Sequence, residues 1–325
     1  LDKAKKEFMG WQHKGWDGLG AFDSNERKIA NDLLGFKGHI VFPTSAFDQV
    51  LAAKEEKVIL GGIKALNKGM SSFCKVDSRM YGAAYIPFNF GEDVALSFLR
   101  EAIKDNFSVI LIDTIAPGGC KAFTHPDFDV VWQEVQNADI AVTLHVGADN
   151  GWDPVPISFY NNNSSVPTHK AGDAPRDALA YMGISYNAEL FLASMIFDGV
   201  LERFPKLRIG VIELGASWII SWMKHLDQSY RAFRRIQDLS KVKKLPSEYV
   251  KEHIKVTPFA GEDIGWLLTS GADDLLMFAS DYPHHEGTDD PIKRFEKTMI
   301  DIDENIKKNF YTNNFKELIG SHLRD

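Results

Sequence analysis

Short apolar segments rich in β-branched and aromatic residues recur along the chain. Seven such segments, each five to eight residues long, lie at 39–43, 81–87, 108–113, 140–146, 207–214, 253–257 and 275–281. Several are almost continuously apolar and do not alternate with polar residues, which is typical of strands that helices bury on both faces. The pattern therefore predicts seven strands of a largely parallel sheet.

Segments with helical periodicity separate the predicted strands. In residues 93–105 (DVALSFLREAIKD) the apolar side chains fall mostly on one face of a helix. Residues 127–138 and 188–204 have similar stripes, and the second ends before Pro205, which cannot continue a helix. Residues 218–251 also look helical. Alternation of strands and helices in this way predicts parallel βαβ units.

Two fold classes use such units, the doubly wound sheet and the (β/α)8 barrel. The Gly-rich motifs GxGxxG and GxxxxGK[ST], which often mark a doubly wound fold, are absent, and no Pro/Gly/Ser-rich linker divides the chain. A (β/α)8 barrel needs eight strands, and residues 1–38 contain no clear strand. We therefore expect residues 1–325 to form a single distorted (β/α)8 TIM-type barrel that lacks its first strand. Because the chain begins with Leu1, we expect that strand either to lie upstream or to have been lost from this copy.

Composition and charge narrow the class of partner. With 37 Lys and Arg against 45 Asp and Glu, the net charge is −8, and no basic block occurs. Nucleic acids and anionic membranes are therefore not expected partners, and no apolar run reaches the 18 residues of a membrane span. Cys74 and Cys120 lack CxxC spacing, which favours free thiols and a cytoplasmic location. A small-molecule substrate fits these properties best.

Three of the predicted strands end in an ionisable residue. His145 lies in TLHVG, Glu213 follows LRIGVI, and Asp281 follows LLMFAS. Barrel enzymes carry their catalytic groups at these strand ends, and a His and an Asp from different strands suit zinc or a similar divalent ion. Each residue also has a structural alternative. His145 could be a hydrogen-bonded core histidine, and Glu213 could form an ion pair with an Arg or Lys at the barrel rim. Asp281 could form an Asx turn or a helix N-cap.

Further candidates lie outside the strand ends. His284 belongs to a dense ionisable cluster that follows Asp281, and we expect it to contact substrate. Residues 147–206 open with a long polar and aromatic insertion, which in a barrel lies over the active-site face. Within it, His169 and Arg176 are candidate substrate contacts, although His169 also fits a surface position. The GxSxG motif of serine hydrolases is absent.

The order of motifs along the chain resembles that of a known family. These motifs are DLLGFKGHIVFPT, MYGAAYIPF, THPDFDVVWQEV, TLHVG, LRIGVIELGASWI, FASDYPHHEG and NFYTNNFKELIG. Between about Asn31 and Gly320 the chain is similar to the amidohydrolase-2 family, which includes the aminocarboxymuconate-semialdehyde decarboxylase-like enzymes. The resemblance implies a distorted (β/α)8 barrel with one divalent metal, usually zinc. It also implies nonoxidative decarboxylation of unsaturated or aromatic carboxylic acids, or hydrolysis of C–N, C–O or C–C bonds.

The resemblance also assigns individual residues. The metal-binding histidine of the family's fifth strand matches His145, and the aspartate of its eighth strand matches Asp281. Where the family often has a histidine after its sixth strand, this chain has Glu213, and the HxH pair of the family's first strand is absent. We therefore expect the chain as given to bind its metal weakly or not at all. The resemblance favours a homodimer.

Three hypotheses about function follow. In the first, the protein is a metal-dependent hydrolase or nonoxidative decarboxylase of a small carboxylated, unsaturated or aromatic substrate. His145 and Asp281 bind the metal, and Asp281 or Glu213 transfers a proton. In the second, supported by the absent HxH pair, the protein is a catalytically silent barrel that binds a ligand or partner. In the third, it is a metal-free lactone or ester hydrolase that uses Asp281 and Glu213 alone.

Overall fold

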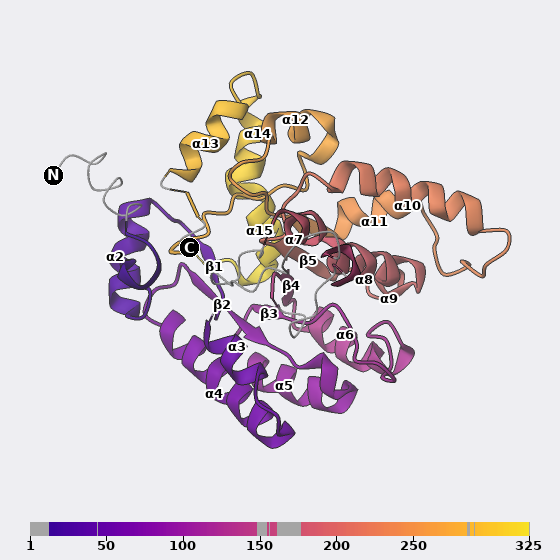
Figure 1. Ribbon diagram of the computed structural model, residues 1–325, viewed down its shortest axis with the longest axis horizontal. Helices are drawn as coiled ribbons and strands as arrows, with labels where there is room; N and C mark the ends of the chain where they lie inside the picture. Colours follow the sequence, from indigo (N-terminus) through magenta and orange to yellow (C-terminus); the bar gives the residue numbers. More distant parts are fainter. Residues whose placement is uncertain are drawn as a thin grey trace.

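A curled parallel sheet forms the centre of the protein (Figure 1). The computed structural model describes residues 13–43, 45–147, 155, 157–160, 177–284, 287–288 and 290–324. Within these residues six strands lie in the order of the chain: β1 His39–Val41, β2 Met80–Tyr85, β3 Val109–Leu111, β4 Ala141–His145, β5 Arg208–Ile212 and β6 Ile254–Val256. Each lies inside or within one residue of a predicted segment. The curled sheet with its surrounding helices is a half-barrel and confirms the predicted barrel class.

The seventh predicted strand, residues 275–281, pairs with the sheet over a short distance only. It makes one parallel bridge, between Leu276 and Val256 of β6. Beyond this bridge the backbone N–H of Phe278 donates to the carbonyl of Phe310, so the chain leaves the sheet edge. All the paired strands are parallel, and their carboxyl ends therefore meet at one edge of the half-barrel.

Helices surround the sheet between successive strands (Figure 1). In the described part of the chain the α-helices are α2 Ser24–Leu34, α3 Ser45–Leu51, α4 Glu56–Cys74, α5 Glu92–Lys104, α6 Asp129–Asn137, α7 Ala178–Gly183, α8 Tyr186–Phe197, α9 Val200–Arg203, α10 Ile219–Phe233, α11 Pro246–His253, α12 Ile264–Leu267, α13 Pro291–Thr298, α14 Glu304–Lys308 and α15 Asn314–Ile319. Their positions confirm the predicted helices at 93–105 and within 127–138 and 218–251. None of the described helices is both long and apolar enough to cross a lipid bilayer.

The prediction of one helix over 188–204 was wrong in its continuity. The segment forms α8 and α9, separated at Gly199, whose φ of 73° is left-handed. A β-carbon at this position would lie 2.6 Å from Cβ of Lys241. Glycine is therefore needed both for the backbone conformation and for the close approach of the α10–α11 connection. Periodicity alone does not reveal such a break.

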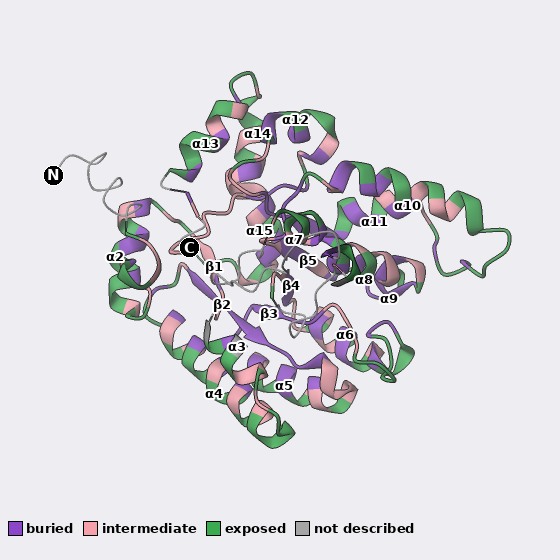
Figure 2. Ribbon diagram, viewed as in Figure 1, coloured by how far each residue is buried: buried purple, intermediate pink, exposed green. Residues whose placement is uncertain are grey.

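The core lies on both faces of the sheet, as the continuous apolar segments predicted. All six residues of β2 are buried, and Figure 2 shows buried strands enclosed by helices with exposed outer faces. Trp132 of α6 is fully buried, and its indole N–H donates to the carbonyl of Phe123 at 2.8 Å. One hydrophobic cluster extends along the chain from Val41 to Ile319. This continuity supports the proposal that the chain forms one domain.

Candidate functional site

Strand register brings two of the predicted site residues together. His145 is the last residue of β4 and lies opposite Ile212, the last residue of β5, so that Glu213 follows directly beside it. The backbone N–H of Glu213 donates to Oγ1 of Thr257, just after β6, at 3.0 Å. The ends of three neighbouring strands therefore fix the position of this carboxylate.

Glu213 also belongs to a cluster with Asp281 and His284. One potential ligand atom from each of these three residues lies within 4.8 Å of the other two. Nδ1 of His284 is 3.1 Å from Oδ1 of Asp281, and both side chains are about three-quarters buried. Two carboxylates and an imidazole this close together form a donor set that suits a divalent cation.

The imidazole of His145 extends the cluster on its other side. Its Nε2 lies 3.0 Å from Oε2 of Glu213, and both side chains are largely buried. Its Nδ1 lies 2.9 Å from the carbonyl oxygen of Val146, an acceptor, so the hydrogen-bond pattern assigns a proton to Nδ1. Nε2 therefore faces the cluster. It either shares a proton with Glu213 or offers a lone pair to a metal.

Both carboxylates of the cluster sit on strained backbone. Glu213 has a φ of 57° and Asp281 a φ of 53°, in the left-handed region that non-glycine residues rarely adopt. Each such residue costs about 1–3 kcal/mol and persists only where its surroundings fix it. Here Oγ1 of Thr257 accepts the backbone N–H of Glu213, and the carbonyl of Asp281 accepts the backbone N–H of His284 at 2.8 Å. Strain of this kind concentrates at functional sites.

The cluster lies in the wall of a cavity of about 1130 Å³. His145, Glu213, Asp281 and His284 all line it. Its other walls are rich in aromatic side chains, which are Trp16, Phe22, Phe36, Phe42, Phe73, Tyr181, Phe259, Phe278, Tyr282 and Phe315. The ring of Phe42 lies 4.4 Å from the His145 imidazole, centre to centre. An apolar cavity with a few convergent polar groups is the usual form of a small-molecule site.

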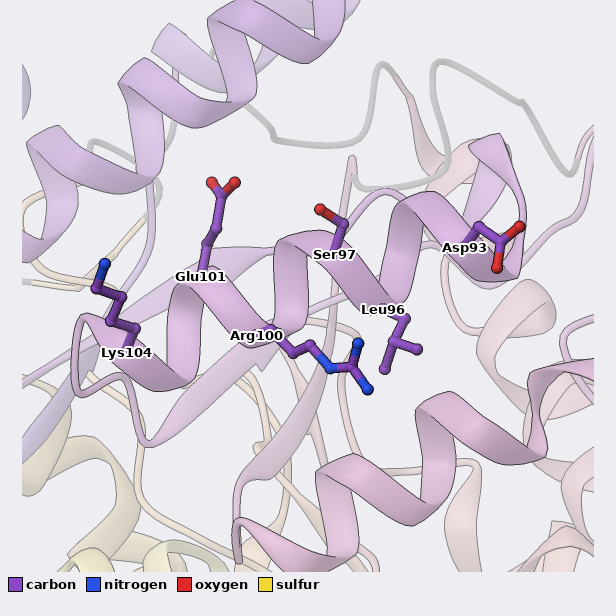
Figure 3. Close-up of a pocket in the computed structure, with 6 residues that line it drawn as sticks. All are labelled: Asp93, Leu96, Ser97, Arg100, Glu101 and Lys104. Carbon is purple, nitrogen blue, oxygen red and sulfur yellow. The ribbon is translucent and has the colours of Figure 1, made fainter.

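A second hollow, shown in Figure 3, lacks these properties. Its described lining comes from α5 alone, and consists of Asp93, Leu96, Ser97, Arg100, Glu101 and Lys104. Their side chains point in different directions, and Glu101 already pairs with Lys64 at 2.6 Å. This hollow is a charged surface groove and carries no candidate chemistry.

The structure thus gathers four of the predicted site residues and adds others. His145, Glu213, Asp281 and His284 meet at one site, whereas the predicted substrate contacts His169 and Arg176 lie outside the described residues. Arg27 and His39 also line the cavity, and the sequence pattern assigned neither of them to the site. Arg27 lies on an amphipathic helix, where the sequence pattern alone places a charged residue on the face exposed to solvent.

Comparison with known proteins identifies the family. Residues 48–314 match the family model described as amidohydrolase. This chain belongs to the amidohydrolase family. It is therefore an enzyme of the amidohydrolase type, which favours the enzyme hypothesis over a catalytically silent barrel. No curated protein matches its sequence.

Solved structures of an amidohydrolase and of two decarboxylases share the fold. An amidohydrolase from Mycobacterium avium subsp. paratuberculosis K-10 superposes with a TM-score of 0.74 at 18% identity, over 93% of this chain and 75% of that chain. A 2,6-dihydroxybenzoate decarboxylase from Rhizobium superposes with a TM-score of 0.68 at 19% identity, over 90% of this chain and 87% of that chain. A dihydroxybenzoic acid decarboxylase from Polaromonas sp. JS666 contains bound manganese and the inhibitor 2-nitroresorcinol. It superposes with a TM-score of 0.67 at 19% identity, over 93% of this chain and 88% of that chain.

Proposed function

We propose that this amidohydrolase is a divalent-metal-dependent enzyme that decarboxylates a small aromatic carboxylate without an oxidant. The observation that carries the proposal is the convergence of Glu213, Asp281 and His284 within 4.8 Å in the wall of an aromatic cavity. Among the similar structures, some decarboxylases are named for dihydroxybenzoates and others for 5-carboxyvanillate, and structures of both kinds hold manganese. These similarities support the substrate class and the metal.

The residues of the cluster fit a divalent metal. Two carboxylates and one imidazole converge, and His145 directs Nε2 toward them while its Nδ1 bonds a backbone carbonyl. Histidine ligands of metals are commonly oriented in this way. A donor set rich in carboxylate oxygen suits Mn²⁺ as well as Zn²⁺. When bound, the metal would supply Lewis acidity that polarises an oxygen of the substrate.

Besides holding the metal, the side chains of the site have proposed roles in proton transfer. In decarboxylation the bond between the ring carbon and the carboxylate breaks, CO₂ leaves, and the electron pair left on the carbon takes up a proton. Glu213 is the proposed proton carrier because it lies 3.0 Å from the imidazole of His145, with which it can share a proton. Asp281 is the second candidate, and His284 at 3.1 Å orients its carboxylate. The aromatic walls hold the ring and exclude water.

Hydrolysis is the second candidate function. The family model that matches 267 residues of the chain, 48–314, is described as amidohydrolase, and the same donor set would serve to activate water. Zinc as the metal, a homodimer and a cytoplasmic location stay predictions.

A turnover assay tests the proposal. The purified protein is loaded with Mn²⁺ or Zn²⁺ and incubated with 2,6-dihydroxybenzoate and 5-carboxyvanillate, and released CO₂ is measured. We expect turnover that Asp281→Asn lowers at least about a hundredfold, while Asp301→Asn, a change of an exposed aspartate outside the cavity, leaves it unchanged. Turnover of aryl esters or amides without any release of CO₂ would contradict decarboxylation and support hydrolysis as the reaction. Equal activity of Asp281→Asn and wild type would refute the site.

A further inference from the structure

A buried arginine lines the same cavity as the carboxylate cluster. Arg27 of α2 is 5% exposed, and its Nε donates to the carbonyl of Gly20 at 2.9 Å. Its guanidinium lies over the rings of Tyr282 and Phe73, at 5.4 and 5.9 Å from their centres. Within the part of the chain that the structure describes, no aspartate or glutamate forms an ion pair with it.

Among the described residues, this arrangement leaves a buried cation without a counter-charge. Burial lowers the pKa of Arg27, although the guanidinium stays charged at neutral pH. A buried charge is costly unless an opposite charge or hydrogen bonds compensate for its lost hydration. The two aromatic rings offset part of that cost. An anion bound in the cavity would offset the rest, because a guanidinium binds a carboxylate with two parallel hydrogen bonds.

His39 of β1 provides a second polar group in this part of the cavity. Its Nε2 is buried and has no hydrogen-bond partner among the described residues. Burial, and then the nearby charge of Arg27, lowers the pKa of His39 to about 3, so the imidazole is neutral. A neutral imidazole offers one donor and one acceptor to a ligand. Arg27 and His39 are therefore both equipped to contact a polar group inside the cavity.

The position of Arg27 relates it to the reacting groups. Tyr282, on which its guanidinium lies, directly follows Asp281 of the cluster. The hydroxyl of Tyr282 donates to the carbonyl of Leu19 at 3.0 Å, next to Gly20, so one turn holds both Arg27 and Tyr282. The cavity, at about 1130 Å³, is large for a ligand of a single aromatic ring, because typical ligand pockets measure about 300–1,000 Å³.

We propose that Arg27, with His39 near it, binds a carboxylate of the substrate that is remote from the reacting group. The substrate is then an aromatic dicarboxylate: one acid group reacts at the cluster of Glu213, Asp281 and His284, while the other stays on Arg27. This inference rests on the proposed function and specifies its substrate class.

Binding of a matched pair of probes tests the proposal without turnover. The affinities of 2-naphthoate and its neutral analogue 2-naphthamide are measured by isothermal titration calorimetry on chelator-treated protein. We expect wild type to bind the naphthoate about tenfold or more tightly than the amide, because only the carboxylate forms charge-assisted hydrogen bonds with the guanidinium. Arg27→Met should abolish this preference and Arg27→Lys should keep part of it. Arg294→Met is the control, since Arg294 lines the cavity but is exposed.

Equal affinity of the two probes for wild type would overturn the proposal, as would a preference that persists in Arg27→Met. If Arg27→Met fails to fold, a crystal structure of the wild-type protein with 6-bromo-2-naphthoate provides the test instead. The anomalous signal of the bromine then locates the bound probe. A carboxylate on Arg27 supports the proposal, and a carboxylate elsewhere overturns it. Because the assay needs neither metal nor turnover, failure of the proposed decarboxylation leaves this result interpretable.

Discussion

Glu262 fixes the loop that carries Glu213, and its replacement should disturb the site from outside the cavity lining. Its carboxylate accepts the backbone N–H groups of Ala216 at 3.0 Å and of Ser217 and Phe259, both at 2.6 Å, and the hydroxyl of Ser217. These donors lie in the loops after β5 and β6, so one side chain connects the two loops. We expect Glu262→Gln to destabilise the protein and to displace the nearby Glu213.

The magnitude follows from the donors that lose an acceptor. Glutamine at position 262 replaces one carboxylate oxygen by an NH₂ group, which would face N–H donors and cannot accept from them. Hydrogen bonds to a charged group contribute about 1.5–3 kcal/mol each, and partial exposure reduces this, so we expect a loss of about 2–4 kcal/mol in unfolding free energy. A displacement of the catalytic carboxylate by about 1 Å would lower turnover by about a hundredfold.

Urea unfolding and the CO₂-release assay measure the two effects. Glu134→Gln serves as the control, because Glu134 is a surface residue whose carboxylate is 3.9 Å from Nε of Arg100. Its replacement should change the unfolding free energy by less than about 0.5 kcal/mol. If Glu262→Gln matched the wild type in both stability and turnover, the position of Glu213 would not depend on this carboxylate, and the reasoning would fail.

Three further changes probe other parts of the structure. His145→Gln should lower turnover at least about a hundredfold with an unchanged circular dichroism spectrum, and near-normal turnover would exclude His145 from the site. The guanidinium of Arg79 holds the pKa of the buried Asp77 well below its usual range, so this carboxylate stabilises the fold above its unfolded pKa. The difference in unfolding free energy between wild type and Asp77→Asn should shrink as the pH falls below about 4, and a constant difference would contradict the assignment. Gly20→Ala should destabilise by more than about 1 kcal/mol and remove the naphthoate preference, because Gly20 has a φ of +77° and a β-carbon there would lie 2.2 Å from Cα of Arg27.

Much of the fold could be predicted from the sequence because its strands are buried on both faces. The continuous apolar segments located all six strands of the described sheet. The same signal overestimated residues 275–281, since only Leu276 bridges to the sheet before Phe278 bonds elsewhere. It also missed the break at Gly199, which depends on contact with Lys241, 42 positions further along the chain.

The site was predictable where it follows strand ends. His145, Glu213 and Asp281 stand at such ends, and parallel register brings the first two together. The approach of His284 depends on the turn that follows Asp281, and sequence spacing could not give its distances. The burial of Arg27 was not predictable, because it results from contacts with Phe73 and Tyr282, which are remote in the chain.

Metal content tests the central claim, that Glu213, Asp281 and His284 form the metal site, most directly. The chelator-treated protein is incubated with Mn²⁺ or Zn²⁺, freed of unbound metal by gel filtration, and assayed by inductively coupled plasma mass spectrometry. The missing HxH pair predicted weak or absent metal binding, but Glu213 and His284 lie beside Asp281 as further donors. We therefore expect one ion per chain in the wild type and in the exposed-site control Asp301→Asn, and its loss in Asp281→Asn. A wild-type protein that retains no ion, or an Asp281→Asn variant that retains as much as the wild type, would contradict the claim.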